Sequence, residues 1–162
     1  MDKEQITSFR EEYFFLSNFY PCNVTIDNIT YNNAEAAFQA QKSEDVDIRK
    51  AFVGLSGKEA KKLGRKVKLR PHWDDIRIPA MQFVVQQKFR ENKDLREKLL
   101  NTKDAELIEC NTWNDRFWGV CKGKGKNILG KILMDTRSYF NSPMTKIIES
   151  LLEEYDGGNE NE

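Results

Sequence analysis

The sequence predicts a single α+β domain that is mostly helical and carries a small antiparallel sheet. Its 162 residues are enough for one ordinary domain with a hydrophobic core. Aromatic and β-branched residues, which are typical of strands, crowd positions 9–31, and helical spacing of apolar residues dominates afterwards. We expect the domain to span residues 1–154 and to be followed by a disordered acidic tail at 155–162.

The first half of the chain predicts a hairpin and three short helices. In CNVTIDNITY, at 22–31, two β-branched runs flank Asp27 and Asn28, a pair typical of a tight turn. Ser56 is suited to cap the third helix and Gly64 to end it. The helices are expected over 33–43, 46–54 and 56–67.

The second half predicts longer helices, one strand and one loop. Pro71 breaks the chain before WDDIRIPAMQFVVQQKFREN, at 73–92, which carries an apolar stripe of helical spacing. Pro79 is expected near the start of this helix or at a kink in it. The remaining elements are a helix at 94–101, a strand at 105–111, a loop rich in Gly and Trp at 111–127, and helices at 127–141 and 143–154.

The composition excludes several classes of protein. Lys and Arg together number 26, as do Asp and Glu, so the net charge is zero. Because proteins that grip duplex DNA usually carry a basic excess, duplex DNA is a poor main partner. No apolar run approaches the length needed to span a membrane, and the N-terminus MDKEQITSFREEY is unlike a signal peptide. We therefore expect a soluble, cytoplasmic protein.

The cysteines and the single histidine give little support to a metal or disulfide site. Cys22, Cys110 and Cys121 are odd in number and form no C-x-x-C motif. His72 is the only histidine, and its neighbours RPHWDD fit a turn before a helix better than a catalytic base. We expect neither a metal nor a cofactor.

Glu35 is the first candidate for chemistry, in YNNAEAAFQAQK at 31–42. Helical spacing puts four side chains on one face of the expected helix: Glu35, Phe38, Gln39 and Lys42. An acid in the first turn also complements the helix dipole, which alone would explain its presence. The aromatic and amide neighbours, and the alanines that let other backbones approach, favour a carboxylate in a cleft. The residues alone leave both interpretations open.

The loop NDRFWGVCKGKGKN, at 114–127, is the second candidate. Three glycines and three lysines precede a helix there, and backbone N–H groups at a helix start can cradle a phosphate. The spacing is not a Walker A motif, and a solvated lysine-rich loop is an equal alternative. The residues assigned to substrate binding are Gly119, Lys124 and Asn127 of this loop, together with Gln39 and Lys42 of the helix expected at 33–43.

The tryptophans and a second acid complete the set. Trp118 on the loop and Trp73 after the Pro71 turn are candidate stacking surfaces for a base, although core packing is the commoner role of a tryptophan. Trp113 is the third tryptophan. Asp115, close to Trp118 in the sequence, is a candidate second carboxylate. Acids, aromatic rings and a phosphate-binding loop suit hydrolysis of a bond between a sugar carbon and a nitrogen. A carboxylate stabilises the oxocarbenium-like transition state of that reaction.

Five segments carry a resemblance to a known family. In chain order they are YFFLSNFYPC, YNNAEAAFQAQK, GRKVKLRPHWDDIRIPAM, KFRENKDLREKLLNT and FWGVCKGKGKNILGKILMDTR. Together they resemble the NADAR family, which includes the YbiA-like proteins, over about residues 9–140. The resemblance implies an α+β domain with N-glycosidase activity. Its members hydrolyse phosphoribosylamino-pyrimidine intermediates of riboflavin synthesis or remove ADP-ribose from nucleobases, notably guanine in DNA.

The resemblance also implies roles for individual residues. Glu35 is similar to the family's catalytic glutamate, and Trp73 and Trp118 are similar to the tryptophans of its W-D and W-G segments. Asn18, in LSNFYP, falls in the N-terminal signature and is expected to line the pocket. Some members carry an aspartate shortly after the W-G pair, where this chain has GVCKGKG. Either Asp115 replaces that aspartate or Glu35 works with a positioned water.

The resulting hypothesis is an N-glycosidase acting on a ribosylated base. Glu35 would stabilise the oxocarbenium or activate water, and Lys42 and the 122–127 loop would meet phosphates. An ADP-ribosylated nucleobase is preferred slightly over the riboflavin intermediate, and modified DNA could be reached through a local patch. The alternatives from other classes are a non-catalytic reader of ADP-ribose or nucleotides, and a structural or interaction protein.

Overall fold

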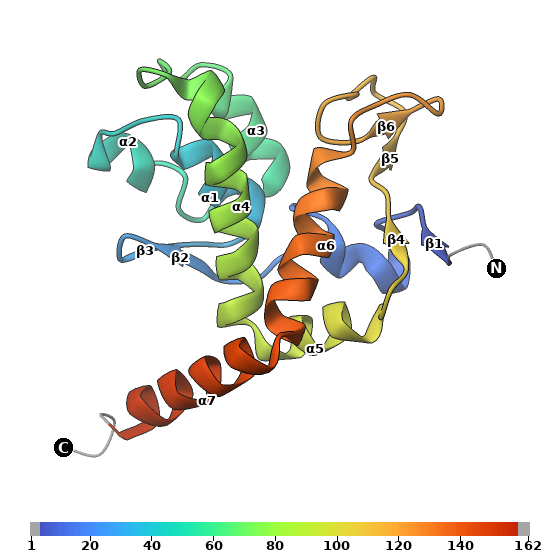
Figure 1. Ribbon diagram of the computed structural model, residues 1–162. Coiled ribbons are helices and arrows are strands. Elements are labelled where there is room, and N and C mark those ends of the chain that lie inside the picture. The colour runs from blue at the N-terminus through green and yellow to red at the C-terminus, as the bar shows by residue number, and fades with distance from the viewer. Residues whose placement is uncertain (1–3, 159–162) are drawn as a thin grey trace.

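The computed structural model describes residues 4–158 and contains the expected mixture of helices and short strands (Figure 1). The first elements are β1 (Gln5–Ile6), the 3-10 helix η1 (Glu11–Leu16), β2 (Val24–Ile26), β3 (Ile29–Tyr31), α1 (Ala34–Ala40), α2 (Val46–Lys50) and α3 (Gly57–Gly64). They are followed by α4 (Trp73–Glu91), α5 (Lys93–Asn101), β4 (Glu106–Leu107), β5 (Cys110–Asn111), β6 (Val120–Cys121), α6 (Ile128–Asn141) and α7 (Pro143–Gly158). The helix-dominated α+β class is confirmed.

The hairpin of β2 and β3 forms as predicted. The strands pair antiparallel, with Val24 opposite Tyr31. Asp27 and Asn28 adopt positive φ angles of 50° and 63°, which a two-residue type I′ turn requires. Val24 and Tyr31 are fully buried, and β2 packs on α4.

The other two strand pairs are parallel and were not predicted. β1 pairs with β4, and β5 pairs with β6. The single strand expected over 105–111 is therefore two strands, because the side chain of Asn127 separates them. Its Nδ2 donates to the carbonyl of Leu107 over 2.9 Å, and its Oδ1 accepts from the amide of Glu109 over 3.0 Å. These two backbone groups bond to a side chain instead of a neighbouring strand.

Helix α1 is enclosed by other elements, and this decides the environment of Glu35. Every residue of α1 is buried. Four of them are alanines, whose small side chains let α3 and α4 pack closely against the helix. Asn33 caps the helix, because its side-chain oxygen accepts from the amide of Ala36 over 2.7 Å.

Helices α4 and α6 lie next to each other and supply much of the core (Figure 1). His72 precedes α4 with a φ of 59° and is exposed, as expected of a turn residue. Pro79 lies in the second turn of α4, and the helix continues through it. The buried apolar side chains of the two helices are Trp73, Met81, Val84, Val85, Phe89, Leu129, Ile132, Leu133 and Phe140.

Several helix ends differ from the prediction. Helix α1 ends at Ala40 and α2 at Lys50, whereas α3 starts with a Ser56–Glu59 capping box and ends at Gly64. Helix α7 continues to Gly158, so residues 155–158 of the expected tail are helical. Residues 159–162 of that tail lie outside the described residues. Within residues 4–158, none of the helices combines the length and apolar character that crossing a bilayer demands.

Candidate active site

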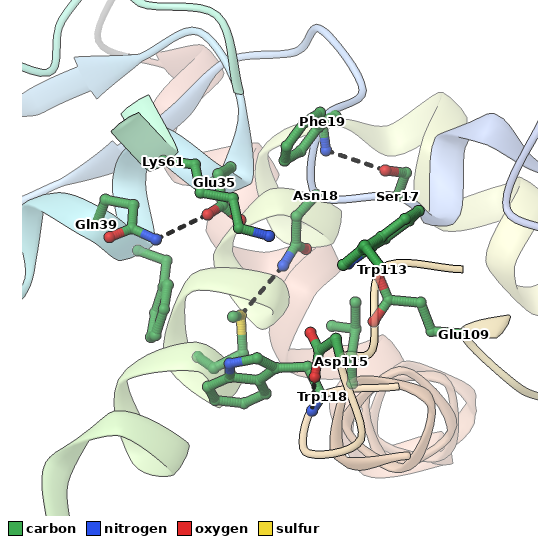
Figure 2. A pocket seen from close by; sticks show the side chains of 13 residues that line it. Ser17, Asn18, Phe19, Glu35, Gln39, Lys61, Glu109, Trp113, Asp115 and Trp118 are labelled. Atoms are coloured by element: carbon green, nitrogen blue, oxygen red, sulfur yellow. Dashed lines mark hydrogen bonds between the residues drawn. The ribbon is translucent and has the colours of Figure 1, made fainter. Parts of the chain in front are cut away.

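A cavity of about 140 Å³ opens where the end of η1, α1 and the loop between β5 and β6 meet (Figure 2). Its wall combines carboxylates, amides, aromatic rings and one lysine. The lining residues are Ser17, Asn18, Phe19, Glu35, Phe38, Gln39, Lys61, Met81, Glu109, Trp113, Asp115, Trp118 and Leu129. Because these residues come from distant parts of the chain, tertiary packing assembles the site.

Glu35 lines this cavity from the first turn of α1 and is only 8% exposed. Its amide donates to the carbonyl of Asn18 over 2.9 Å, which fixes the start of α1 to the segment after η1. Burial raises the pKa of Glu35, while the hydrogen bond from Gln39 and the charges of Lys61 and Lys42 oppose that rise. The carboxylate therefore lies in a cleft and is more than a solvated acid at a helix start.

Gln39 orients the Glu35 carboxylate. Its Nε2 donates to Oε1 of Glu35 over 2.8 Å, and the bond is drawn in Figure 2. Gly64 of α3 makes room for the amide, because a Cβ at that position would clash with the side-chain oxygen of Gln39. The close packing of α1 on α3 thus fixes the group that hydrogen-bonds the acid.

Glu109 is a second acid in the cavity, half-buried, and it was not among the residues predicted from the sequence. It follows β4, where Asn127 holds its amide. Burial raises the pKa of Glu109 to about 7, with the negative charges of Asp115 and Glu35 adding to the rise and Lys61 opposing it. Its buried Oε2 has no hydrogen-bond partner among the residues described. An acid inside IECN, within a segment expected to be a strand, was the only signal in the sequence.

Asp115 shapes the loop as well as lining the cavity. Its Oδ1 accepts from the amides of Phe117 and Trp118, over 3.0 and 2.9 Å. Its own backbone amide and carbonyl bond to the side chain of Asn111. Asp115 is therefore near Trp118, as expected, but one carboxylate oxygen already holds the loop together.

Trp118 forms an aromatic wall of the cavity. Its ring packs edge-on against Phe38 and Phe117, with centroid separations of 5.4 and 4.8 Å. Trp113, for which no role was predicted, is 56% exposed and also lines the cavity. Together the two indoles offer one supported surface and one open surface for a flat ring.

The structure corrects the expectation that Trp73 faces the substrate. Trp73 is only 7% exposed and does not line the cavity. Its ring lies 5.5 Å from that of Phe38, measured between centroids, and Phe38 also contacts Trp118. Trp73 therefore supports the aromatic wall by core packing.

Asn18 lines the cavity, as the resemblance implies. Its Nδ2 lies 3.3 Å from the sulfur of Met81, to which it donates. The preceding segment is held by the buried Lys88, whose Nζ donates to the carbonyls of Phe15 and Ser17 over 2.6 and 2.9 Å. Burial lowers the pKa of Lys88 to about 8. This buried ammonium group fixes the backbone that presents Asn18.

The expected phosphate cradle at the start of α6 does not form. The backbone amides of Asn127, Ile128 and Leu129 donate to carbonyls of the preceding loop. Those carbonyls belong to Gly119, Phe117 and Trp118 respectively, so the amides are not free to bind an anion.

Four predicted substrate ligands lie outside the cavity lining. Lys42 donates to a backbone carbonyl of α3 over 3.1 Å, and Lys124 is exposed on the loop after β6. Gly119 is buried against the carbonyl of Glu109, where a Cβ would clash. Asn127 is buried and holds the amide of Glu109. Gly119 and Asn127 therefore position an acid, and the two lysines make no contact with the cavity.

A cationic groove of about 720 Å³ adjoins the cavity. Phe19, Lys61 and Trp113 line both, so the two spaces are continuous at these side chains. The complete lining of the groove is Phe19, Lys58, Lys61, Lys62, Arg65 and Trp113. Although the chain has no net charge, α3 and its C-cap concentrate positive charge beside the acids. The pattern KEAKKLGR, at 58–65, was the signal in the sequence.

Within residues 4–158, no three His, Cys, Asp or Glu side chains are grouped as a metal site requires. Cys22, Cys110 and Cys121 are free thiols.

The fold and the cavity first define a class. A buried carboxylate and a half-buried one that line the same aromatic-walled cavity are typical of hydrolases that cleave glycosidic bonds. A family model, the NADAR domain, matches residues 5–141. The chain belongs to the NADAR family, as its motifs indicated.

Comparisons with known proteins agree with this assignment. N-glycosidase YbiA of Escherichia coli is 36% identical over 131 residues, which are 78% of this chain and 81% of that protein. N-glycosidase Npun_R5314 of Nostoc punctiforme is 37% identical over 134 residues, covering 78% of this chain and 85% of that protein. The NMR structure of Escherichia coli YbiA has a TM-score of 0.76 at 34% identity, covering 93% of this chain and 89% of that one.

A longer relative contains a similar region. Riboflavin biosynthesis protein VVA0006 of Vibrio vulnificus is 40% identical over 131 residues, or 78% of this chain. The match spans only 35% of the Vibrio protein, so this chain corresponds to about a third of it.

Proposed function

We propose that this domain is an N-glycosidase that hydrolyses the bond between a ribose carbon and a base nitrogen. One observation carries the proposal: Glu35 and Glu109 share an aromatic-walled cavity, and burial raises the pKa of both. Two carboxyl groups with different environments are what an acid and a charge-stabilising group require. The relatives named N-glycosidases support a hydrolase acting on N-glycosyl compounds.

In this proposal Glu109 is the general acid. With a pKa of about 7, a substantial fraction of Glu109 is protonated at neutral pH, where an acid catalyst is most effective. It gives its proton to the leaving base nitrogen while the carbon–nitrogen bond breaks and its electrons stay with the base. The departing base is therefore neutral, and positive charge builds on the ribose ring.

Glu35 is then the group that stabilises this charge. The hydrogen bond from Gln39 and the charges of Lys61 and Lys42 favour its ionised form against the effect of burial. The carboxylate lowers the energy of the oxocarbenium-like state and accepts a proton from the attacking water. The new carbon–oxygen bond yields free ribose hydroxyl and free base, and proton exchange with solvent restores both acids.

The size of the cavity bears on the substrate. A cavity of about 140 Å³ is close to the size that accepts one six-membered ring, so a larger substrate must extend outwards. The adjoining groove offers Lys58, Lys62 and Arg65 for phosphates and the exposed ring of Trp113 for a second base. We therefore favour an ADP-ribosylated nucleobase, free or in single-stranded or flipped DNA.

The second candidate substrate is a phosphoribosylamino-pyrimidine. It is supported by the name of the Vibrio vulnificus relative, a riboflavin biosynthesis protein. Its single phosphate would use only the part of the groove nearest Lys61.

The test offers both substrates to the protein and follows products by mass spectrometry. We expect released ADP-ribose from the modified base, and a slower release of ribose phosphate from the pyrimidine. Glu35→Gln should abolish turnover while substrate still binds in calorimetry, and Glu97→Gln, at an exposed position of α5, is the matched control. Tight binding without turnover by the unmodified protein would instead identify a non-catalytic reader.

A further inference from the structure

The last helix, α7, is amphipathic but is placed with its apolar side outwards. Helix α7 extends away from the rest of the fold beyond the end of α6 (Figure 1). Its apolar side chains are 44–72% exposed. They are Met144, Ile147, Ile148, Leu151, Leu152 and Tyr155, and we call them the α7 stripe. The spacing of three and four residues puts all of them on one helix face.

Charged residues hold the opposite part of the helix on the body of the protein. Glu149 is buried, 7% exposed, and its carboxylate lies 3.0 Å from Arg90 and 3.9 Å from Arg96. Glu153 pairs with Arg96 over 2.7 Å and with Lys93 over 3.7 Å. An amphipathic helix of a monomer normally buries its apolar face. Here ion pairs to α4 and α5 instead hold the polar face against the protein and leave the apolar face exposed.

The exposed area is large for a monomer. With these exposed fractions, the α7 stripe leaves on the order of 600 Å² of side-chain surface open, the upper end of the largest patch on a typical monomer. Two such stripes facing each other would bury on the order of 1,200 Å², which reaches the range of specific, stable interfaces.

The order of residues along the α7 stripe is symmetric about its midpoint, between Glu149 and Ser150. Reversing the helix direction superposes Ile148 on Leu151 and Ile147 on Leu152. It also superposes Met144 on Tyr155. A two-fold interface requires this property, since residue i of one copy must meet residue j of the other and the reverse.

The charge of α7 disfavours a lipid surface as the occupant. Helices that lie on membranes carry Lys and Arg on the polar face. The sequence of α7 has Lys146 as its one basic residue, against the acids Glu149, Glu153, Glu154 and Asp156.

We propose that the α7 stripe is the interface of a two-fold symmetric dimer, in which α7 packs antiparallel on α7 of a second copy. The stripe lies beyond residues 5–141, the part matched by the NADAR family model. It is also remote from the cavity, because the β5–β6 loop adjoins the start of α6 and α7 follows its end (Figure 1). In the proposed dimer the cavity of each copy therefore remains open.

The first test measures the mass of the full chain by sedimentation velocity from nanomolar to high-micromolar concentrations. We expect twice the chain mass at the upper end, and the single-chain mass throughout for Leu151→Glu. Ser150→Glu, on the exposed polar face of the same helix, is the matched control and should remain dimeric. Circular dichroism checks that both variants are folded. If Leu151→Glu does not fold, the milder Leu151→Ala replaces it and should weaken dimerisation. A single-chain mass of the unmodified protein at every concentration overturns the proposal, even if the chain binds vesicles or another protein.

The second test fixes the orientation of the helices. Met144→Cys and Tyr155→Cys chains, both carrying Cys110→Ser to remove the exposed native thiol, are mixed and oxidised. Antiparallel packing predicts disulfides between the two different chains. Disulfides that form only between identical chains indicate parallel helices and contradict the proposed interface.

Discussion

Gln39 donates a hydrogen bond to the buried carboxylate of Glu35 over 2.8 Å, one helical turn further along α1. Burial raises the pKa of Glu35, and this bond is the largest influence that opposes it. The amide can approach because Gly64 of α3 has no side chain. The protonation state of the acid therefore depends on how α1 packs against α3.

Replacing Gln39 by Leu should shift the pH dependence of activity. Without the hydrogen bond, the pKa of Glu35 rises further, so the carboxylate is ionised only at higher pH. We expect the acidic limb of kcat/KM against pH to move upwards, with activity near pH 6 about fivefold lower. An unchanged acidic limb, measured alongside the control Gln86→Leu on α4, would show that Glu35 does not have to be ionised.

Replacing Glu109 by Gln should remove the alkaline limit on activity. Glu109 has a pKa of about 7, so its proton is available below that pH and lost above it. The unmodified enzyme should slow as the pH rises through 7. Glu109→Gln should be slower by about 10²–10⁴-fold below pH 7 and nearly independent of pH above it. A retained alkaline limb would assign the acid role to another group, for which Asp115, a further acid of the cavity lining, is the candidate.

The same substitution should stabilise the fold at alkaline pH. The carboxyl of Glu109 binds its proton more tightly when folded than when unfolded, where the pKa is about 4.3. The stability that this proton contributes is fully present below about pH 4 and is lost as the pH rises through 7. Glu109→Gln should therefore raise the free energy of unfolding at pH 8 by up to about 3 kcal/mol, and much less at pH 5. Urea unfolding at the two pH values measures this difference.

Alanine substitutions of Trp113 and Trp73 should affect different properties, substrate binding in the first case and stability in the second. Trp113→Ala removes an exposed ring beside the cavity and should weaken substrate binding by about 1–3 kcal/mol with little change in stability. Trp73→Ala removes a buried ring and should cost about 3–5 kcal/mol of stability. Measuring KM and thermal unfolding for both variants separates the roles. If Trp113→Ala leaves KM unchanged, no part of the substrate stacks there.

If the cationic groove binds the phosphates of the substrate, its contribution to KM should depend on salt concentration. Lys62→Ala and Arg65→Ala, both at groove positions, should each raise KM by about two- to fivefold at low ionic strength, since exposed charge contacts are worth up to about 1 kcal/mol. The difference should shrink as salt increases. Lys122→Ala, at an exposed position outside the groove, is the matched control. Equal effects of all three variants would point to overall charge in place of a defined phosphate site.

Asn127→Ala should lower kcat, although the side chain of Asn127 does not line the cavity. The side chain holds the carbonyl of Leu107 and the amide of Glu109, and its loss leaves two buried backbone groups unpaired. We expect about 2–3 kcal/mol lower stability and a larger fall in kcat than in KM, because Glu109 loses its position. A variant that is destabilised but retains kcat would limit Asn127 to a structural role.

Local signals in the sequence were sufficient for several features. The turn at Asp27 and Asn28, the cap at Ser56 and a helix that carries Glu35 depend on neighbouring residues, and all three were predicted, although that helix is shorter than expected. The alanines around Glu35 correctly indicated close packing. The ordered motifs correctly indicated the NADAR family.

Other features depended on contacts between distant residues. Nothing local distinguishes Trp73, which is buried, from Trp113, which is exposed. The loop at 114–127 has the composition of a phosphate site, yet its own carbonyls occupy the amides that would bind the anion.

The sequence by itself determined the β2–β3 hairpin, the helices, the family and the candidate acid Glu35, because turns, caps and helical faces are set by residues a few positions apart. Only the tertiary structure decided that Glu109 joins Glu35 in one cavity. Asn127, eighteen residues away along the chain, binds the amide of Glu109 and directs that segment inwards. Burial then raises the pKa of the acid to about 7, and burial is a property of the packed fold.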